Sequence, residues 1–96
     1  MNKYSVDKIA SDFLREIADK SRLLRKEKKY SQQQLAKRAN VSLGSYKRFE
    51  QTGQISFESL LNIAFVLGRL KDFDNLFKID DSAEIIKLFQ ALKDKK

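Results

Sequence analysis

The side chains best suited to binding chemistry are basic, and they are concentrated in one stretch of the chain. Between Lys20 and Arg48 there are ten Lys or Arg residues and one acidic residue, Glu27, which gives this stretch a formal charge of +9. The remaining residues carry ten basic and twelve acidic side chains, or −2, in a chain whose net charge is +7. A focused basic surface attracts polyanions by long-range Coulomb forces, although a merely solvated lysine-rich surface would have the same composition.

Chemistry that depends on cysteine or histidine is excluded. The sequence has no cysteine, so neither a disulfide nor a thiolate metal site can form. It also has no histidine, the commonest general base and metal ligand. Asp80, Asp81 and Glu84 form an acidic cluster, but they lie at the expected start of a helix, where carboxylates stabilise the helix dipole. We therefore predict that the protein is not an enzyme and has no cofactor and no metal.

The elements that must position the basic side chains are all predicted to be helices. Proline is absent, glycine occurs at only three positions, and no stretch keeps strand-like alternation. No segment approaches the roughly 18 apolar residues that cross a bilayer, and the first residues lack the apolar run of a signal peptide. We expect a cytoplasmic protein of the all-α class: a compact bundle of five to six helices forming a single domain over residues 1–96.

Cap residues and apolar spacing set the predicted bounds of these helices. The predicted spans and caps are 6–29 with Ser5, 32–39 with Ser31, 43–51 with Ser42, 57–67 with Ser56, 71–77, and 83–94 after Asp80-Asp81-Ser82. The first helix, which could break near residues 19–21, has an apolar face of Ile9, Phe13, Ile17, Ser21 and Leu24. The fourth has a stripe of Phe57, Leu60, Leu61, Ala64 and Leu67. Gly53 and Gly68 follow helices and can close them in the left-handed conformation.

The segment SQQQLAKRANVSLGSYKRFEQTG, from Ser31 to Gly53, contains two short capped helices separated only by Asn40-Val41-Ser42. This gap is too short for an antiparallel hairpin, so the helices must cross, and the small Ala36 is placed at the crossing. The apolar interface is predicted to comprise Leu35, Ala39, Val41, Tyr46 and Phe49. Asn40 occupies the point of the turn that needs a positive φ, which Asn tolerates better than most residues.

In these positions the sequence resembles the phage repressor and Cro class of helix-turn-helix domains, the XRE family. The matching residues are Leu35, Ala36, Ala39, Val41, Tyr46 and Phe49, whereas the usual turn glycine of the family is Asn40 here. The resemblance covers a family core at about residues 23–77 and leaves an N-terminal helical extension and a C-terminal helix. It implies a lambda-repressor-like DNA-binding domain and a sequence-specific, double-stranded DNA-binding transcriptional regulator, with repression as the expected activity.

The resemblance also implies which residues contact DNA, because in this family the third helix, here about 43–51, enters the major groove. The implied base contacts are Ser42, Leu43, Gly44, Ser45 and Arg48. Arg48 could bond guanine O6 and N7 together, and Leu43 could contact a thymine methyl. Gly44 replaces a long polar residue, and it either lets the backbone approach DNA or reads nothing. The expected phosphate contacts are Gln32, Lys28, Lys29, Lys37, Arg38 and Lys47, and each of the five basic residues could instead be a solvated side chain.

Arg25 and Glu50 occupy positions where the resembling repressors pair an arginine of the first helix with a glutamate that ends the third. The resemblance therefore implies a structural ion pair that holds the recognition helix in position. Ala36, at the helix crossing, is the third residue expected to be structural.

A second chain is the partner expected besides double-stranded DNA, because one motif covers only a half-site and specific binding usually needs a dimer. Two surfaces could form the homodimer or could be ordinary core. One is Phe65, Val66, Phe73, Leu76 and Phe77, and the other is Ile85, Ile86, Leu88, Phe89 and Leu92 of the last helix. The alternative function is that of an antitoxin, HipB-like, which binds a cognate toxin and regulates its own operon. RNA binding is disfavoured because the chain lacks a sheet bearing stacking aromatics.

Overall fold

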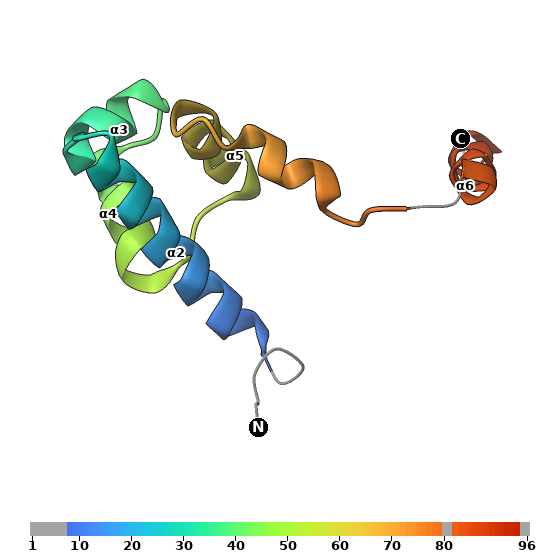
Figure 1. Cartoon of the computed structure of the whole chain (residues 1–96), viewed down its shortest axis with the longest axis horizontal. Coiled ribbons are helices and arrows are strands. Elements are labelled where there is room, and N and C mark those ends of the chain that lie inside the picture. The colour runs from blue at the N-terminus through green and yellow to red at the C-terminus, as the bar shows by residue number, and fades with distance from the viewer. Residues whose placement is uncertain (1–7, 80–81, 95–96) are drawn as a thin grey trace.

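A computed structural model of the chain describes residues 8–79 and 82–94, and every regular element in these ranges is helical. The elements are α2 (Ala10–Glu27), α3 (Gln32–Arg38), α4 (Leu43–Thr52), α5 (Phe57–Val66), the 3-10 helix η1 (Leu70–Asn75) and α6 (Ser82–Asp94). Figure 1 shows α2 crossing α4, with α3 and α5 packed at the far end of the crossing. The all-α prediction is confirmed. Within the described ranges, none of the helices combines the length and the apolar content needed to span a membrane.

The first described helix is shorter at both ends than the sequence predicted. The predicted span 6–29 was wrong at residues 8 and 9, because Ile9 is extended (φ −107°, ψ 172°) and its backbone N–H donates to Asp12 Oδ2 at 3.2 Å. The helix ends at Glu27 because Lys29 takes a positive φ of 62°. It runs unbroken through residues 19–21. The predicted cap Ser5 lies outside the described residues.

The core is centred on the crossing of α2, α3 and α4. The side chains buried most completely are those of Tyr46, Phe49, Leu35 and Ile63, and the small Ala18 and Ala36 let the helices approach closely. Along α2 the buried positions are Ala18, Ser21 and Arg25, at the three- and four-residue spacing of one helix face. This buried line faces α4, so the interior of the molecule is built largely around the second of the two motif helices.

Two predicted apolar faces are only partly buried. On α2, the predicted residues Ile9, Phe13 and Ile17 are all more than a third exposed, because the buried line of this helix is rotated toward Ala18. On α5, Phe57 was predicted to lie in the core stripe but is 54% exposed. Its ring instead packs edge-to-face on Phe73, with the ring centroids 5.9 Å apart.

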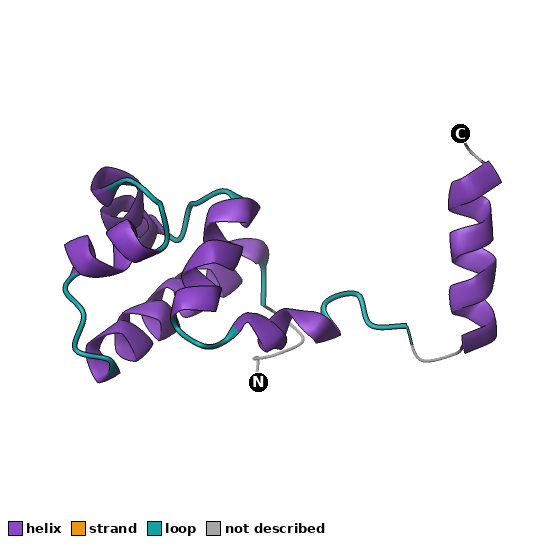
Figure 2. Ribbon diagram, turned by 90° about the horizontal axis from the view of Figure 1, so that it is seen from above, coloured by secondary structure: helices purple, strands orange, loops and turns teal. Residues whose placement is uncertain are grey.

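The C-terminal elements also differ from the prediction. The helix expected at 71–77 is a 3-10 helix that ends at Asn75, and Phe77 beyond it has a positive φ of 55°. The last helix begins at Ser82, one residue before the predicted start, and the predicted cap residues Asp80 and Asp81 lie outside the described residues. No described residue of α6 is buried, and the helix stands apart from the other elements in both ribbon views (Figures 1 and 2).

Candidate nucleic-acid interface

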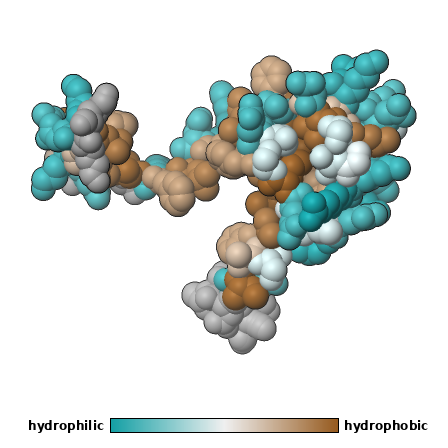
Figure 3. Space-filling view, turned by 180° about the vertical axis from the view of Figure 1, so that it is seen from behind, coloured by the Kyte–Doolittle hydropathy of each residue, from teal (hydrophilic) through white to brown (hydrophobic). Residues whose placement is uncertain are grey.

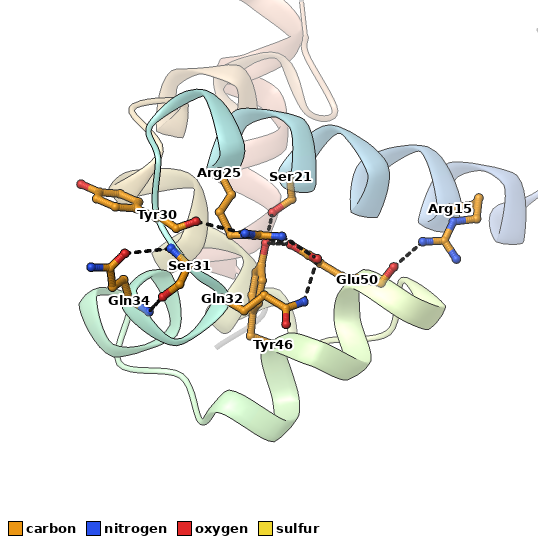
Figure 4. A network of polar contacts seen from close by, with 9 residues as sticks. All are labelled: Arg15, Ser21, Arg25, Tyr30, Ser31, Gln32, Gln34, Tyr46 and Glu50. Carbon is orange, nitrogen blue, oxygen red and sulfur yellow. Dashed lines mark hydrogen bonds and ion pairs between the residues drawn. The ribbon is translucent and has the colours of Figure 1, made fainter.

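The first helix of the motif, α3, is fixed at its start by a reciprocal pair of hydrogen bonds. The backbone N–H of Gln34 donates to Ser31 Oγ at 3.0 Å, and the backbone N–H of Ser31 donates to Gln34 Oε1 at 2.8 Å (Figure 4). This capping box satisfies amides that a helix start leaves without intrahelical acceptors. The predicted cap Ser31 is therefore confirmed, and the start of this seven-residue helix is set by its own sequence.

The turn between the motif helices is closed by backbone hydrogen bonds and one left-handed residue. The backbone N–H of Val41 donates to Ala36 O at 2.9 Å, and Asn40 has a φ of 58°. Ser42 then caps α4 by accepting from the backbone N–H of Ser45 at 3.0 Å. Ala36, placed where the helices cross, is 2% exposed. The positive φ predicted at Asn40 and the predicted cap Ser42 are confirmed.

The second motif helix, α4, has one buried face and one exposed face. Tyr46 and Phe49 are 0% and 1% exposed, and their rings pack edge-to-face with centroids 5.9 Å apart. The residues predicted to meet bases lie on the exposed side and at the start of the same helix. Ser42, Gly44, Ser45 and Arg48 are exposed, and Leu43 is half-buried. The helix therefore presents these side chains to solvent while its opposite side is packed into the core.

A buried network of polar side chains ties α4 to α2. The guanidinium of Arg25 donates to Glu50 through Nε at 2.8 Å and through Nη2 at 3.2 Å, and only 10% and 6% of the two side chains are exposed. The hydroxyl of Tyr46 donates to Glu50 Oε2 and lies 2.9 Å from Ser21 Oγ. Gln32 Nε2 donates to Glu50 Oε1 at 2.9 Å (Figure 4). Glu50 therefore joins residues of α2, α3 and α4 at one carboxylate.

The protonation of this network follows from its partners. Burial alone would raise the pKa of Glu50, but the hydrogen bonds from Arg25, Tyr46 and Gln32 outweigh it and hold that pKa below its ordinary value. The hydrogen bond to Glu50 raises the pKa of Arg25. Burial, with the hydrogen bond to Glu50, raises the pKa of Tyr46 to about 12. The network therefore consists of a carboxylate, a guanidinium and a neutral phenol at neutral pH.

A second arginine of α2 holds the C-terminal end of α4. Arg15 donates through Nη1 to the carbonyl oxygen of Gln51 at 2.6 Å and through Nη2 to that of Glu50 at 2.5 Å. Its guanidinium also lies 3.3 Å from a carboxylate oxygen of Asp19, one helical turn along α2. The last carbonyl groups of a helix lack intrahelical donors and carry partial negative charge, so a guanidinium satisfies and stabilises them.

The predicted phosphate contacts lie around the motif and are mostly exposed. Exposed side chains are those of Lys28, Lys29, Lys37, Arg38 and Lys47. The guanidinium of Arg38 stacks over the ring of Tyr30, 4.7 Å from its centroid, which restricts its orientation. Gln32 is half-buried and is held by Glu50. Its amide nitrogen carries two hydrogens, and the bond to Glu50 uses one of them.

Arg48, the side chain predicted to read guanine, is hydrogen-bonded to a residue that follows the end of α4. Arg48 Nη2 donates to Gln54 Oε1 at 2.9 Å, while the hydroxyl of Thr52 donates to the carbonyl oxygen of Arg48 at 2.8 Å. The backbone N–H of Gln54 in turn donates to Thr52 Oγ1 at 3.1 Å. Arg48 is therefore an exposed guanidinium that already has one polar partner.

Sequence reasoning did not identify four residues of this site: Arg15, Ser21, Tyr46 as a polar group, and Gln54. Ser21 and Tyr46 were assigned to apolar faces by their spacing, which does not report where a hydroxyl points. Arg15 lies 35 residues from Glu50 along the chain. No local pattern connects residues so far apart. Gln54 lies only six residues from Arg48, but in a loop whose path no periodicity predicts.

The chain matches the sequence model of a known protein family. The sequence model of a family described as Helix-turn-helix matches residues 22–79, more than half of the 96-residue chain. The matched region runs from within α2 through η1 and contains both motif helices and their turn. No curated protein and no solved structure matches the chain.

Proposed function

Because the chain belongs to the XRE family of helix-turn-helix regulators, we propose that this DNA-binding regulator reads specific double-stranded sites in the major groove with α4 and represses transcription. The observation that carries this proposal is the two-sidedness of α4. Tyr46 and Phe49 lock one side into the core, while the predicted base-contacting residues occupy the exposed side. A helix held rigidly at a basic surface can lie against base pairs without being ordered on binding.

Within α4 we assign base contacts to Ser42, Leu43, Gly44, Ser45 and Arg48. Arg48 combines exposure with a partner, Gln54, that orients its guanidinium before DNA arrives. Phosphate contacts are assigned to Lys28, Lys29, Gln32, Lys37, Arg38 and Lys47. For Gln32 the support is its amide, which Glu50 holds by one hydrogen and which has a second hydrogen to donate.

Replacing Arg48 by Ala is expected to weaken binding to the protein's specific DNA site, its operator, by about 1–3 kcal/mol and to relax the base preference at one position of that site. Selection from a random DNA library at two salt concentrations would first define the operator and its symmetry. Lys71→Ala, which removes one exposed positive charge from η1, serves as the control. Equal affinity and equal base preference for wild type and Arg48→Ala would remove Arg48 from the proposed reading surface.

Gly44 supports close approach of the α4 backbone to DNA. The position is helical, and a Cβ added there would meet no heavy atom within 4 Å, so the fold itself does not require glycine. Glycine in a helix costs roughly 0.5–1 kcal/mol relative to alanine. An external contact accounts for a glycine that the fold does not need.

The expected result for Gly44→Ala is therefore a gain of up to about 1 kcal/mol in unfolding free energy together with weaker operator binding. Urea unfolding and a binding titration on the same samples measure the two quantities. Increased stability with unchanged operator affinity would show that the glycine has no role at the DNA surface.

We also propose that the protein binds DNA as a homodimer, since two recognition helices can then occupy half-sites about one helical turn, ~34 Å, apart. The second candidate function is that of an antitoxin, which needs a separate protein-binding surface. Phe65, 69% exposed on α5, would suit such a surface. Co-expression with the product of the neighbouring gene, followed by purification of a defined complex, would support that candidate.

A further inference from the structure

An open apolar groove lies between α2 and the segment formed by α5 and η1. Its volume is about 550 Å³, and its walls include Ile17 and Leu23 of α2, Leu60 of α5, Leu67 just beyond α5, and Phe73 and Leu76 at η1. None of the residues assigned to DNA contact lines this groove. Large exposed apolar surfaces in soluble proteins usually mark sites of association. A partner held in this groove would leave α4 free.

The C-terminal helix α6 has an apolar stripe whose residues are all at least partly exposed. Ile85, Leu88, Phe89 and Leu92 recur at positions i, i+3, i+4 and i+7, which is the spacing of one helix face. No described residue of α6 is buried, and Phe89 is 60% exposed. A 13-residue helix with this pattern gains most of its stability from packing against another apolar surface.

A second hollow lies beside the groove and borders α6. This hollow, about 620 Å³ in volume, lies between the α6 stripe and the segment from Leu76 to Ile79. Leu76 lines both spaces, so the groove and the hollow are neighbours. In Figure 3 apolar surface runs from the helical body outward along the connection toward α6. Residues of the stripe line this hollow but not the groove, so the groove is the apolar trough that α6 leaves open.

We propose that two copies of the chain dimerise by exchanging α6, so that the stripe of each helix lies in the trough of the other copy. This inference rests on the homodimer proposed above and specifies its interface. Each copy has one stripe and one trough, so a two-fold arrangement fills both troughs and leaves no free stripe. Stable interfaces bury about 1,200–2,000 Å² in total, and the exchange doubles the buried area because the helix-and-groove contact forms twice.

The test measures the mass of the full-length protein by sedimentation equilibrium, without DNA. Phe89→Glu introduces a charge into the stripe, and Leu23→Glu introduces one into the groove. These side chains are 60% and 66% exposed in the single chain, so neither substitution disturbs its core. Ile86→Glu, on the same helix but outside the stripe and 65% exposed, is the matched control. Leu76→Glu is a second groove variant, and helix content with the melting curve verifies folding of each protein.

The wild type and Ile86→Glu are expected to be dimers. Phe89→Glu and Leu23→Glu should each raise the dimer Kd by ~10-fold or more, since each places a charge in apolar contacts on both sides of the dimer. Mixing the two variants is expected to restore part of the dimer. One mixed pair keeps one unaltered stripe in one unaltered groove, which neither variant has alone.

Other outcomes would overturn the proposal in recognisable ways. A dimer weakened by Phe89→Glu but not by either groove variant would show that α6 pairs with α6. A monomeric wild type would show that the trough takes the chain's own α6 or an unrelated protein. Absence of partial recovery in the mixture would exclude exchange. Failure of the proposed DNA-binding function would be distinguishable, because the dimer would then form normally but select no DNA.

Discussion

Glu50→Gln is expected to lower the unfolding free energy by about 3–5 kcal/mol, because it leaves the guanidinium of Arg25 buried without a counter-charge. With 6% of the Glu50 side chain and 10% of the Arg25 side chain exposed, the value for a buried pair applies and not the much smaller value for a surface pair. The substitution also weakens the acceptor for Tyr46 and Gln32. Urea unfolding followed by far-ultraviolet circular dichroism measures the loss.

Two further variants show whether the loss of stability comes from the unpaired buried charge of Arg25. Glu58→Gln removes the same formal charge from an exposed side chain in the first turn of α5 and is expected to lower stability by at most about 1 kcal/mol, the value of a carboxylate at a helix start. The double variant Arg25→Met with Glu50→Leu removes both charges and is expected to be more stable than Glu50→Gln. A Glu50→Gln protein that unfolds at the same urea concentration as wild type would contradict the buried network.

The pH dependence of this effect follows from the lowered pKa of Glu50. Since the folded-state pKa lies below the ordinary value of 4.5, the stabilisation is fully present above about pH 4.5 and is lost as the pH falls through the folded-state pKa. The stability difference between wild type and Glu50→Gln should therefore shrink in acid, because protonated Glu50 is also uncharged. A difference that stays constant between pH 6 and pH 3 would show that the carboxylate is not favoured by folding.

Gly53→Ala is expected to destabilise the protein by about 2–5 kcal/mol, the sum of backbone strain and a steric clash. Gly53 closes α4 with a φ of +83°, which favours glycine. A Cβ at this position would lie 2.7 Å from both Cβ and the carbonyl oxygen of Leu14 in α2. Because part of this obstacle is helix backbone, relief requires α2 and α4 to move apart. Operator binding should weaken as well, since α2 holds α4 in place through Arg15 and Arg25.

Gly68→Ala separates the two contributions. Gly68 also has a positive φ, +75°, but a Cβ there would meet no heavy atom within 4 Å. It is therefore expected to cost only about 1–2 kcal/mol of backbone strain. Thermal and urea unfolding of both variants give the comparison. Equal losses at the two glycines would show that α2 and α4 do not make a close contact at Gly53.

The proposed exchange of α6 requires that the stability measurements be made at a defined protein concentration. If two copies exchange α6, the unfolding midpoint depends on protein concentration, because association stabilises the folded state by mass action. Variants of Glu50 and Gly53 must therefore be compared at one fixed concentration. The Phe89→Glu background, which is expected to weaken the dimer, allows the same comparison on a single chain.

Several features of the site were determined by the sequence alone because they depend on atoms only a few residues apart. The caps Ser31, Ser42 and Ser56 each bond an amide three residues ahead. The left-handed conformations of Asn40 and Gly53 follow from what those residues tolerate near their own backbone. Burial of Ala36, Tyr46 and Phe49 follows from the repeat of the helix. These local preferences sufficed to predict the two crossing helices, whereas the base-contacting residues of α4 were assigned from the family resemblance.

Other features were decided only when whole helices packed together. Arg15 meets the carbonyl groups at the end of α4, and Leu14 meets Gly53, because of where α2 crosses α4. The same crossing turned α2 so that Ala18 faces inward and Phe13 outward, and it brought the Ser21 and Tyr46 hydroxyls together. Spacing along a chain reports which residues share a helix face but not what lies opposite that face. Opposing surfaces are set by the packing of helices that are distant in sequence, so only the tertiary structure could supply them.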